Sequence, residues 1–180
     1  MQSTPDDINT EITPREFELL VCDYLTETGK ELKTFTARHD VEINKTDGDY
    51  QIDVYAEFEY LGANFKILVE CKRHKNKIKR EVVQLLFDKL RATGSQKGII
   101  FSTSKFQEGA VIFAKEHGIA LIHVINGKYT FFTKSNDAQA FNPPPWVDIP
   151  KYVGEFRTGG AICFLQKGYM ESLDEFIFNK

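Results

Sequence analysis

The chain has 180 residues, 42% of them hydrophobic, which is enough for one globular domain with a full core. Its net charge of −3 is not typical of a protein that coats nucleic acid, so any contact with DNA has to come from a local basic patch. No apolar run approaches the ~18 residues of a membrane span, the N-terminus lacks the features of a signal peptide, and the three scattered cysteines show neither zinc spacing nor a disulfide framework. We therefore expect a cytoplasmic protein that does not bind a membrane.

The first predicted helix begins at Thr13-Pro14-Arg15-Glu16, with threonine as the N-cap, proline at the first helical position and glutamate at the third. Apolar residues then recur at helical spacing as far as Gly29, which is a plausible stop: Phe17, Leu20, Val21, Tyr24 and Leu25. Glu18 lies beside this apolar stripe. A lone helical glutamate is more commonly a boundary carboxylate than a functional group, and both interpretations are open at this point.

Three strands are predicted next, over Lys33–Ile43, Tyr50–Tyr60 and Phe65–Lys72. His39 lies on the apolar face of the first strand and is interpreted as a hydrogen-bonded structural residue rather than a metal ligand, because buried polar groups are normally paired. A turn that contains Asp47-Gly48 separates the first two strands.

The second and third strands carry the candidate chemistry of the chain. Residues two apart on a strand share a face, so Glu70 and Lys72 lie together, opposite an apolar face formed by Ile67, Val69 and Cys71. If these two strands pair as a hairpin, Asp53 joins Glu70 and Lys72. Two carboxylates and an ammonium are what a divalent cation and an activated water require. Alternating charge also marks the solvated face of many strands, and this is the alternative interpretation.

The densest basic stretch of the chain, Lys72–Arg80, follows the third strand directly. Charge runs are usually solvated loops, but this one leaves the predicted carboxylate cluster, where a phosphate backbone would have to be held. Its candidates for contacts with DNA are Arg73, Lys75, Lys77, Lys79 and Arg80.

The remaining elements alternate between helix and strand. A helix over Arg80–Thr93 carries Gln84 on its polar side and ends at Gly94, and a buried strand over Gly98–Thr103 follows. Ser104-Lys105-Phe106-Gln107 is interpreted as a capping box that opens the next helix. A strand over Ile119–Ile125 then leads to Asn126-Gly127, which is typical of a type I′ hairpin that returns through Lys128–Thr133.

Residues 134–180 differ in character from the rest of the chain. The stiff segment Asn142-Pro143-Pro144-Pro145-Trp146 is interpreted as a structural strap, with binding of a partner as the alternative. A terminal amphipathic helix is marked by Met170, Leu173, Phe176 and Ile177, and it covers either this core or a second subunit. We therefore expect a domain over 1–133 and a C-terminal extension over 134–180 that packs on the core or mediates assembly, as a homodimer or with a partner protein.

The order helix, three antiparallel strands, helix, strand, helix, strand is an α/β pattern, and it resembles the core of restriction-endonuclease-like nucleases. Asp53 followed by Glu70-Cys71-Lys72 resembles the signature of the PD-(D/E)xK nuclease superfamily. Within it the chain is most similar to the catalytic domain of Mrr-like restriction endonucleases, over about residues 14–125. The matching blocks are Phe17-Glu18, Gln51-Ile52-Asp53-Val54, Glu70-Cys71-Lys72-Arg73, Val82-Val83-Gln84-Leu85, Lys97-Gly98-Ile99-Ile100-Phe101-Ser102-Thr103-Ser104, Phe106-Gln107-Glu108-Gly109-Ala110 and Gly118-Ile119-Ala120-Leu121.

That resemblance implies a Mg²⁺-dependent DNA endonuclease of restriction or defence, in which Mn²⁺ can substitute, in a prokaryotic cytoplasm next to the nucleoid. Asp53, Glu70 and the backbone carbonyl of Cys71 would bind the metal, and Glu18 would bind a second metal or support the site. Lys72 would orient or help deprotonate the attacking water and offset charge on the scissile phosphate. The catalytic set implied by the resemblance is Asp53, Glu70, Lys72, Glu18 and Gln84.

Other functions are compatible with the same core. A structure-directed repair or junction nuclease would use the same residues on a different DNA substrate. A DNA-binding assembly subunit with a vestigial site belongs to a different class, and the intact set of Asp53, Glu70 and Lys72 argues against it. A toxin-like or defence effector that a partner activates is a third class, and the unassigned residues 134–180 are its only support.

Overall fold

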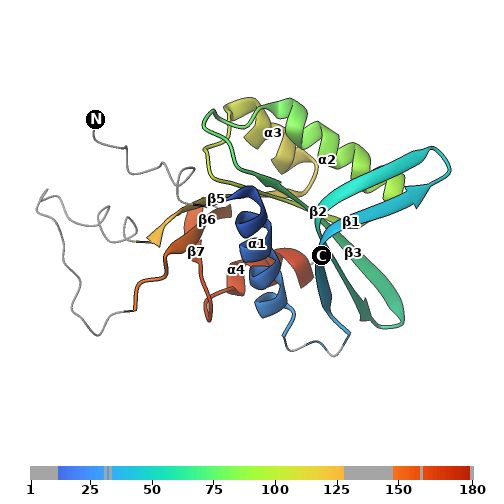
Figure 1. Ribbon diagram of the computed structural model, residues 1–180, viewed down its shortest axis with the longest axis horizontal. Coiled ribbons are helices and arrows are strands. Elements are labelled where there is room, and N and C mark those ends of the chain that lie inside the picture. Colours follow the sequence, from blue (N-terminus) through green and yellow to red (C-terminus); the bar gives the residue numbers. More distant parts are fainter. Residues whose placement is uncertain (1–11, 31, 33, 128–147, 159, 179–180) are drawn as a thin grey trace, which may run out of the picture.

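The computed structural model describes residues 12–30, 32, 34–127, 148–158 and 160–178. Within them seven strands form one mixed sheet in the order β1 to β7, with α1 and α4 on one face and α2 and α3 on the other (Figure 1). The elements are α1 (Pro14–Thr28), β1 (Thr36–Lys45), β2 (Gly48–Tyr60), β3 (Ala63–Lys72), α2 (Arg80–Thr93), β4 (Lys97–Ser102), α3 (Glu108–Glu116), β5 (Ile119–Asn126), β6 (Tyr152–Thr158), β7 (Ala161–Leu165) and α4 (Glu171–Phe178). No helix in these ranges is both long and apolar enough to cross a membrane.

Helix α1 begins as its sequence predicts. The Thr13 hydroxyl accepts from the Glu16 N–H at 3.2 Å, and the Glu16 carboxylate accepts from the Thr13 N–H at 2.8 Å, so the capping box is confirmed. Pro14 follows the cap, where its missing N–H costs no hydrogen bond. The helix buries Phe17 and Val21 against the sheet, on the stripe that the periodicity predicts.

The predicted order of the nuclease core is also confirmed. Strands β1, β2 and β3 form an antiparallel meander, and β3, β4 and β5 are parallel because α2 and α3 make the crossovers between them. The carboxyl ends of β3, β4 and β5 therefore meet at one edge of the sheet, where Lys72 pairs with Ser102 and Ser102 pairs with His123. Functional loops of open α/β sheets lie at such an edge.

Two apolar clusters sandwich the sheet and decide which way each strand residue points. The cluster under α1 and α4 includes Val69 and Phe101, and the cluster under α2 and α3 includes Leu68 and Ile100. Neighbouring residues of the central strands are thus buried on opposite faces, as expected for parallel strands covered on both sides. Glu70 shares the α2 side with Leu68, so it is a carboxylate on an otherwise apolar face.

Helix α3 starts later than the sequence analysis predicts. The capping box at Ser104–Gln107 is wrong, because α3 begins at Glu108 and Gln107 makes no side-chain cap. The Ser104 hydroxyl instead donates to the Asn76 carbonyl at 2.8 Å, across to the loop that follows β3. The Ser104 side chain thus makes a tertiary contact instead of the helix cap that the local sequence pattern predicts.

The described part of the C-terminal extension continues the sheet. Strand β6 pairs with β5 and β7 pairs with β6, both antiparallel, and neither strand was predicted. The Nδ1 of His123 on β5 lies 3.6 Å from Glu155 Oε2 on β6, and the neighbouring His123 and Arg157 lower the pKa of Glu155 to about 2. The predicted return strand Lys128–Thr133, the proline-rich segment with Trp146 and the 133/134 boundary lie outside the described residues.

Helix α4 covers the core of its own chain. Met170, Leu173 and Ile177 are buried in the same cluster as α1, and Phe176 packs against that cluster. The apolar stripe that suggested a second subunit is therefore used within the chain, which is the alternative that closes the domain.

Replacement of Leu173 by alanine tests this packing. Leu173 is fully buried, so we expect Leu173→Ala to lower the free energy of unfolding by about 2–5 kcal/mol. Urea denaturation followed by circular dichroism measures the change. Glu175→Ala, at an exposed position of the same helix, is the control and should change the free energy by less than about 0.5 kcal/mol. Equal effects of the two substitutions would contradict the packing of α4 on the core.

Candidate active site

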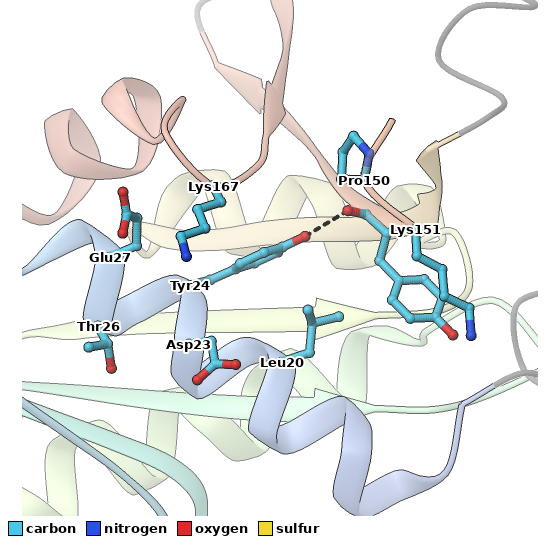
Figure 2. A pocket seen from close by; sticks show the side chains of 9 residues that line it. Leu20, Asp23, Tyr24, Thr26, Glu27, Pro150, Lys151 and Lys167 are labelled. Carbon is cyan, nitrogen blue, oxygen red and sulfur yellow. Dashed lines mark hydrogen bonds between the residues drawn. The ribbon is translucent and has the colours of Figure 1, made fainter. Parts of the chain in front are cut away.

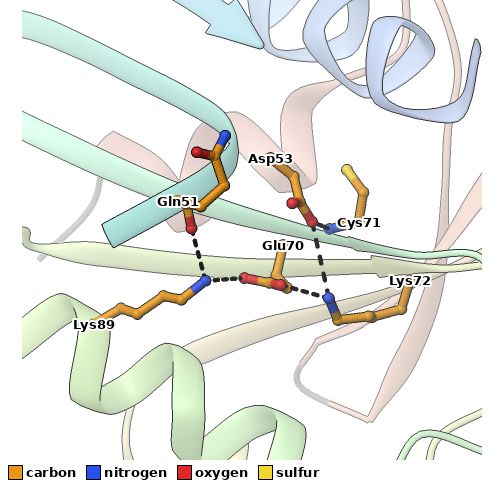
Figure 3. Close-up of polar contacts among 6 residues, drawn as sticks. All are labelled: Gln51, Asp53, Glu70, Cys71, Lys72 and Lys89. Carbon is orange, nitrogen blue, oxygen red and sulfur yellow. Dashed lines mark hydrogen bonds and ion pairs between the residues drawn. The ribbon is translucent and has the colours of Figure 1, made fainter. Parts of the chain in front are cut away.

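The pairing of β2 with β3 brings Asp53, Glu70 and Lys72 together (Figure 3). Val54 pairs with Val69 at the end of this ladder, and Asp53 and Glu70 are the next residues along each strand. The Asp53 Oδ2 accepts from the backbone N–H of Cys71 at 2.7 Å and lies 3.9 Å from the Lys72 Nζ. Lys72 also forms an ion pair with Glu70 Oε1. The ammonium of Lys72 thus reaches both carboxylates, as predicted. The alternation of β2 is interrupted at Asp53, because Ile52 is buried in the cluster under α2 and α3 and Val54 in the cluster under α1 and α4.

Lys89 of α2 belongs to this cluster and was missed by the sequence analysis. Its Nζ lies 3.0 Å from Glu70 Oε2 and donates to the Gln51 carbonyl at 2.8 Å (Figure 3). The available signal was its position, three residues after Leu86 and next to Leu90, on the side of the helix that is otherwise buried. A lysine on an apolar helical stripe indicates a buried partner, although the sequence does not say which carboxylate provides it.

Burial and like charge set the electrostatics of the cluster. The Glu70 side chain is 8% exposed and that of Asp53 is 22% exposed. Burial raises the pKa of Asp53, and the neighbouring Glu70 charge raises it further, against the opposing effects of the Cys71 N–H and the two lysines. Burial by itself would lower the pKa of Lys72, but Glu70 and Asp53 together outweigh that effect and raise it. Lys72 is therefore held as a cation.

Glu18 of α1 approaches the same cluster from the other side of the sheet edge. Its pKa is raised by partial burial first, and then by the charges of Asp53 and Asp40. Asp40 of β1 was not predicted to be a site residue, yet it has a left-handed φ of 56° and lies beside the register position opposite Asp53. Its carboxylate accepts from the Gln51 side chain at 2.6 Å. Tertiary pairing of β1 with β2, rather than any local motif, places this fourth acidic group.

His39 differs from its prediction. It is half-buried on the inner side of β1, as expected, but within the described residues its Nδ1 is buried without a hydrogen-bond partner. The expectation of a hydrogen-bonded structural histidine is therefore wrong for that nitrogen.

Two other predicted residues lie at the margin of the cluster. The Lys72 carbonyl accepts from Thr103 N–H in the direction of β4, at 3.1 Å. Successive carbonyls of a strand point to opposite sides, so the Cys71 carbonyl points toward β2 and Asp53. Burial raises the pKa of the Cys71 thiol. Gln84 is half-buried on α2, and among the described residues it makes no hydrogen bond to Asp53, Glu70 or Lys72.

The basic loop, residues 73–80, is an ordered connection. Ile78 is buried, its N–H donates to the Lys105 carbonyl, and its carbonyl accepts from the Gln107 N–H, both at 2.9 Å. The Thr103 hydroxyl accepts from the His74 N–H at 3.1 Å. The backbone of the basic loop is thus fixed to the segment that joins β4 to α3.

The cations of the basic loop divide into two groups. The Arg73 Nε donates to the Ile12 carbonyl at 2.6 Å, and the Arg80 guanidinium lies 5.1 Å above the centre of the Phe113 ring. Lys75, Lys77 and Lys79 are exposed, which leaves them available for phosphates. The two arginines have structural roles in addition to any contact with DNA.

The donor set fits a hard divalent cation. Mg²⁺ is commonly bound by one or two carboxylates and keeps several waters, so Asp53, Glu70 and the Cys71 carbonyl provide suitable oxygen ligands. Lys72 shows that a positive group can reach both carboxylates at once. Within the described residues no group of three or more histidine, cysteine, aspartate or glutamate side chains forms a ready metal cage, so water would complete the coordination.

A cavity of about 500 Å³ lies elsewhere, between α1 and the start of β6 (Figure 2). The Tyr24 hydroxyl donates to the Tyr152 carbonyl across it, at 3.0 Å. The residues that line it are Leu20, Asp23, Tyr24, Thr26, Glu27, Pro150, Lys151, Tyr152 and Lys167. None of the carboxylates around Asp53 contributes to it, and the chemistry is expected at the sheet edge rather than in this cavity.

Comparison with protein families gives a match that spans most of the nuclease core. The sequence model of the family Mrr_cat, described as restriction endonuclease, matches residues 9–126, which is more than half of the chain. The chain belongs to the Mrr_cat restriction endonuclease family. The matched range contains Asp53, Glu70, Lys72, Lys89 and the whole basic loop, and it ends at the last residue of β5.

Solved structures show only distant likeness to this Mrr_cat chain. A protein of unknown function, AF1548, is 24% identical with a TM-score of 0.48 and covers 58% of this chain and 54% of its own. Can2 from Sulfobacillus thermosulfidooxidans, solved with cyclic tetra-adenylate, is 20% identical with a TM-score of 0.49, over 60% of this chain and 32% of its own. The restriction endonuclease MspJI, solved with a 27-mer oligonucleotide, is 19% identical with a TM-score of 0.39, over 59% and 25%.

The matched part thus spans about half or less of the length of those solved proteins. No curated protein matches this Mrr_cat chain.

The crowding of carboxylates around Asp53 can be measured through Glu18. The pKa of Glu18 is raised above the ordinary 4.5, so the folded protein holds this proton more tightly than the unfolded chain does. The free energy of unfolding therefore falls as pH rises from about 4.5 through the folded-state pKa. We expect Glu18→Gln to match the wild type at pH 3.5–4 and to be more stable at pH 7 in the presence of a chelator. Urea denaturation as a function of pH measures the difference.

Glu16 provides a control on the same helix with the opposite sign. The backbone and side-chain hydrogen bonds of Thr13 lower the pKa of Glu16 below 4.5. The ionised carboxylate therefore stabilises the folded state above pH 4.5, and this contribution to the free energy of unfolding disappears as pH falls. Glu16→Gln should therefore be less stable than the wild type at pH 7. If both substitutions change stability in the same direction, the proximity of Glu18 to the acidic cluster is not what sets its effect.

Proposed function

We propose that this chain is a DNA endonuclease that hydrolyses phosphodiester bonds with Mg²⁺, for which Mn²⁺ can substitute. The observation that carries the proposal is the convergence of Asp53, Glu70 and Lys72 at one sheet edge, in a chain of the Mrr_cat family. Asp53, Glu70 and the Cys71 carbonyl would hold the metal. When bound, it would supply positive charge that activates a water and neutralises the phosphate.

Lys72 would orient or help deprotonate the attacking water and offset charge on the scissile phosphate. Without metal, burial alone would lower the pKa of Lys72, but the charges of Glu70 and Asp53 outweigh it and raise the pKa. In its ammonium form Lys72 can donate to a phosphate oxygen. Charge that develops on the scissile phosphate is stabilised by groups that are already oriented for it. The ion pair with Glu70 provides that orientation.

Glu18 would support the cluster from α1, either by binding a second metal or by orienting a water. Its pKa is raised first by burial and then by the charges of Asp53 and Asp40, and a bound divalent cation would offset the effect of those charges. Gln84 would lie near the phosphate, as the resemblance implies. Its half-buried side chain on α2 is without a hydrogen bond among the described residues, and its amide N–H can donate one to a phosphate oxygen.

The basic loop would hold the DNA backbone next to this cluster. It starts directly after Lys72, and its backbone is fixed by Ile78 and Thr103, so its exposed lysines are presented from a defined position. Phosphate contacts fix the orientation of a protein on DNA without reading its sequence. Sequence or structure specificity would then come from other residues or from a partner.

Three alternatives lead to different results with DNA. A junction or flap nuclease would cut branched substrates in preference to plain duplex. An assembly subunit with a vestigial site would bind DNA without metal-dependent cleavage, and a partner-activated effector would cut only when the partner is added. A homodimer is retained as a proposal on catalytic grounds alone, because one site cuts one strand.

Substitution of the metal ligands tests the proposed chemistry on supercoiled plasmid. We expect the wild type to cut in Mg²⁺ or Mn²⁺, Asp53→Asn and Glu70→Gln to show no detectable cleavage, and Lys72→Met to lose about 10²–10³ in turnover. Asp88→Asn, at an exposed position of α2, is the control and should cut like the wild type. Linear rather than nicked product at early times would indicate two cooperating sites. A wild type that binds plasmid but never cuts it would refute the enzyme proposal.

Salt dependence tests the basic loop separately from the chemistry. Each of Lys75→Ala, Lys77→Ala and Lys79→Ala should weaken DNA binding and reduce the slope of log Kd against log salt by about one unit for each phosphate that the lysine neutralises. Fluorescence anisotropy in Ca²⁺ or chelator measures binding without cleavage. Lys115→Ala, on the exposed side of α3, should leave the slope unchanged. Unchanged slopes for all three loop variants would mean that the basic loop is only a solvated connection.

A further inference from the structure

Glu70 is held from two directions by lysine side chains. Lys72, two residues along the same strand, pairs with Oε1, and Lys89 of α2 lies 3.0 Å from Oε2 (Figure 3). Both oxygens of this carboxylate therefore have an ammonium partner. A divalent cation that binds through Glu70 has to compete with at least one of them.

Lys89 is a largely buried member of the carboxylate cluster. The Lys89 side chain is 14% exposed, and two residues of the same helix that flank its position on the buried face, Leu86 three residues earlier and Leu90 one residue later, are buried. An ammonium removed from water needs acceptors, and here they are Glu70 Oε2 and the Gln51 carbonyl. Lys89 thus connects α2, β2 and β3 at the carboxylate cluster.

The charges around Glu70 are balanced by these contacts. Asp53 and Glu70 provide two negative charges, and Lys72 and Lys89 provide two positive ones. A divalent cation between the carboxylates would stand close to both ammonium groups in a poorly solvated place, where like charges repel strongly. Lys72 lies within 4 Å of a carboxylate oxygen of both Asp53 and Glu70, so its displacement would break two ion pairs. Lys89 pairs with Glu70 through Oε2, so its displacement would break one.

We propose that Lys89 is a metal-responsive positioning residue, which holds Glu70 in the absence of a divalent cation and releases Glu70 Oε2 when the cation binds. The inference rests on the proposed metal-dependent function of the Asp53–Glu70 pair. It makes Lys89 a competitor of the cation, so metal binding by the free protein is weaker than its carboxylates alone would give.

Titration calorimetry with Mn²⁺ on the full chain, without DNA, tests this competition. Lys89→Met keeps most of the side-chain volume and removes the charge, and we expect it to lower the Kd for Mn²⁺ at least tenfold with unchanged stoichiometry. Lys115→Met on α3 removes an exposed lysine that does not contact Glu70, and its Kd should stay within twofold of the wild type.

A second variant and a second readout guard against a folding defect. Lys89→Gln removes the charge but keeps a donor for the Gln51 carbonyl, and it should tighten Mn²⁺ binding in the same direction. Without metal, Lys89→Met should melt at a lower temperature than the wild type, because Glu70 then has one cation fewer. Saturating Mn²⁺ should then raise the melting temperature of Lys89→Met by more than it raises that of the wild type.

The outcomes separate this inference from the proposed function. An unchanged Kd in both Lys89 variants would make Lys89 a structural contact, and a higher Kd would mean that Lys89 orients Glu70 for the metal; either result overturns the inference. If Asp53→Asn abolishes Mn²⁺ binding while the Lys89 variants leave it unchanged, only the inference fails. If Asp53→Asn has no effect on Mn²⁺ binding, or no variant binds Mn²⁺, both fail.

Discussion

Repulsion between two largely buried carboxylates is the constraint around which the nuclease core is arranged. Asp53 and Glu70 are the next residues after the last pair of β2 with β3, Val54 with Val69, and an uncompensated pair of buried carboxylates would be strongly destabilising. Compensation comes from two elements: the Cys71 N–H and Lys72 of β3, and Lys89 of α2. The balance is incomplete, as the raised pKa of Asp53 shows. Additional positive charge next to Asp53 and Glu70 would therefore be stabilised.

The edge that holds these carboxylates also fixes the backbone of the basic loop. Lys72 ends β3, and its carbonyl accepts from Thr103 at the end of β4, so the loop leaves the sheet at the point where two parallel strands end. The Thr103 and Ser104 hydroxyls then bind the backbone of the loop, and Ile78 anchors it. Cations on a fixed backbone lose less conformational freedom on binding phosphate than cations on a mobile segment. The carboxylate cluster and the basic loop therefore share one rigid support.

The described part of the C-terminal extension supports this site indirectly. Helix α4 packs beside α1 in one apolar cluster, and α1 carries Glu18 into the field of Asp53. Strand β6 covers the edge of β5 with antiparallel backbone hydrogen bonds, and the side chain of His123 lies 3.6 Å from that of Glu155. Removal of these elements would expose the apolar face of α1 and an unpaired sheet edge, which is a hazard for aggregation.

The sequence by itself determined the elements whose signals are local. The capping box at Thr13, the alternation along β3, and the match to the Mrr-like pattern were sufficient to predict α1, the order of the core and the meeting of Asp53 with Glu70 and Lys72. Alternation along β2 is interrupted at Asp53, where Ile52 and Val54 are buried on opposite faces. Only the tertiary structure decided that Lys89 completes the cluster, that Asp40 lies beside it, that Ser104 binds the basic loop instead of capping α3, and that β6, β7 and α4 extend the core of the same chain. The physical reason is that periodicity along a helix or strand specifies which face a side chain occupies, whereas its partner comes from an element distant in sequence, whose approach depends on packing of the whole sheet.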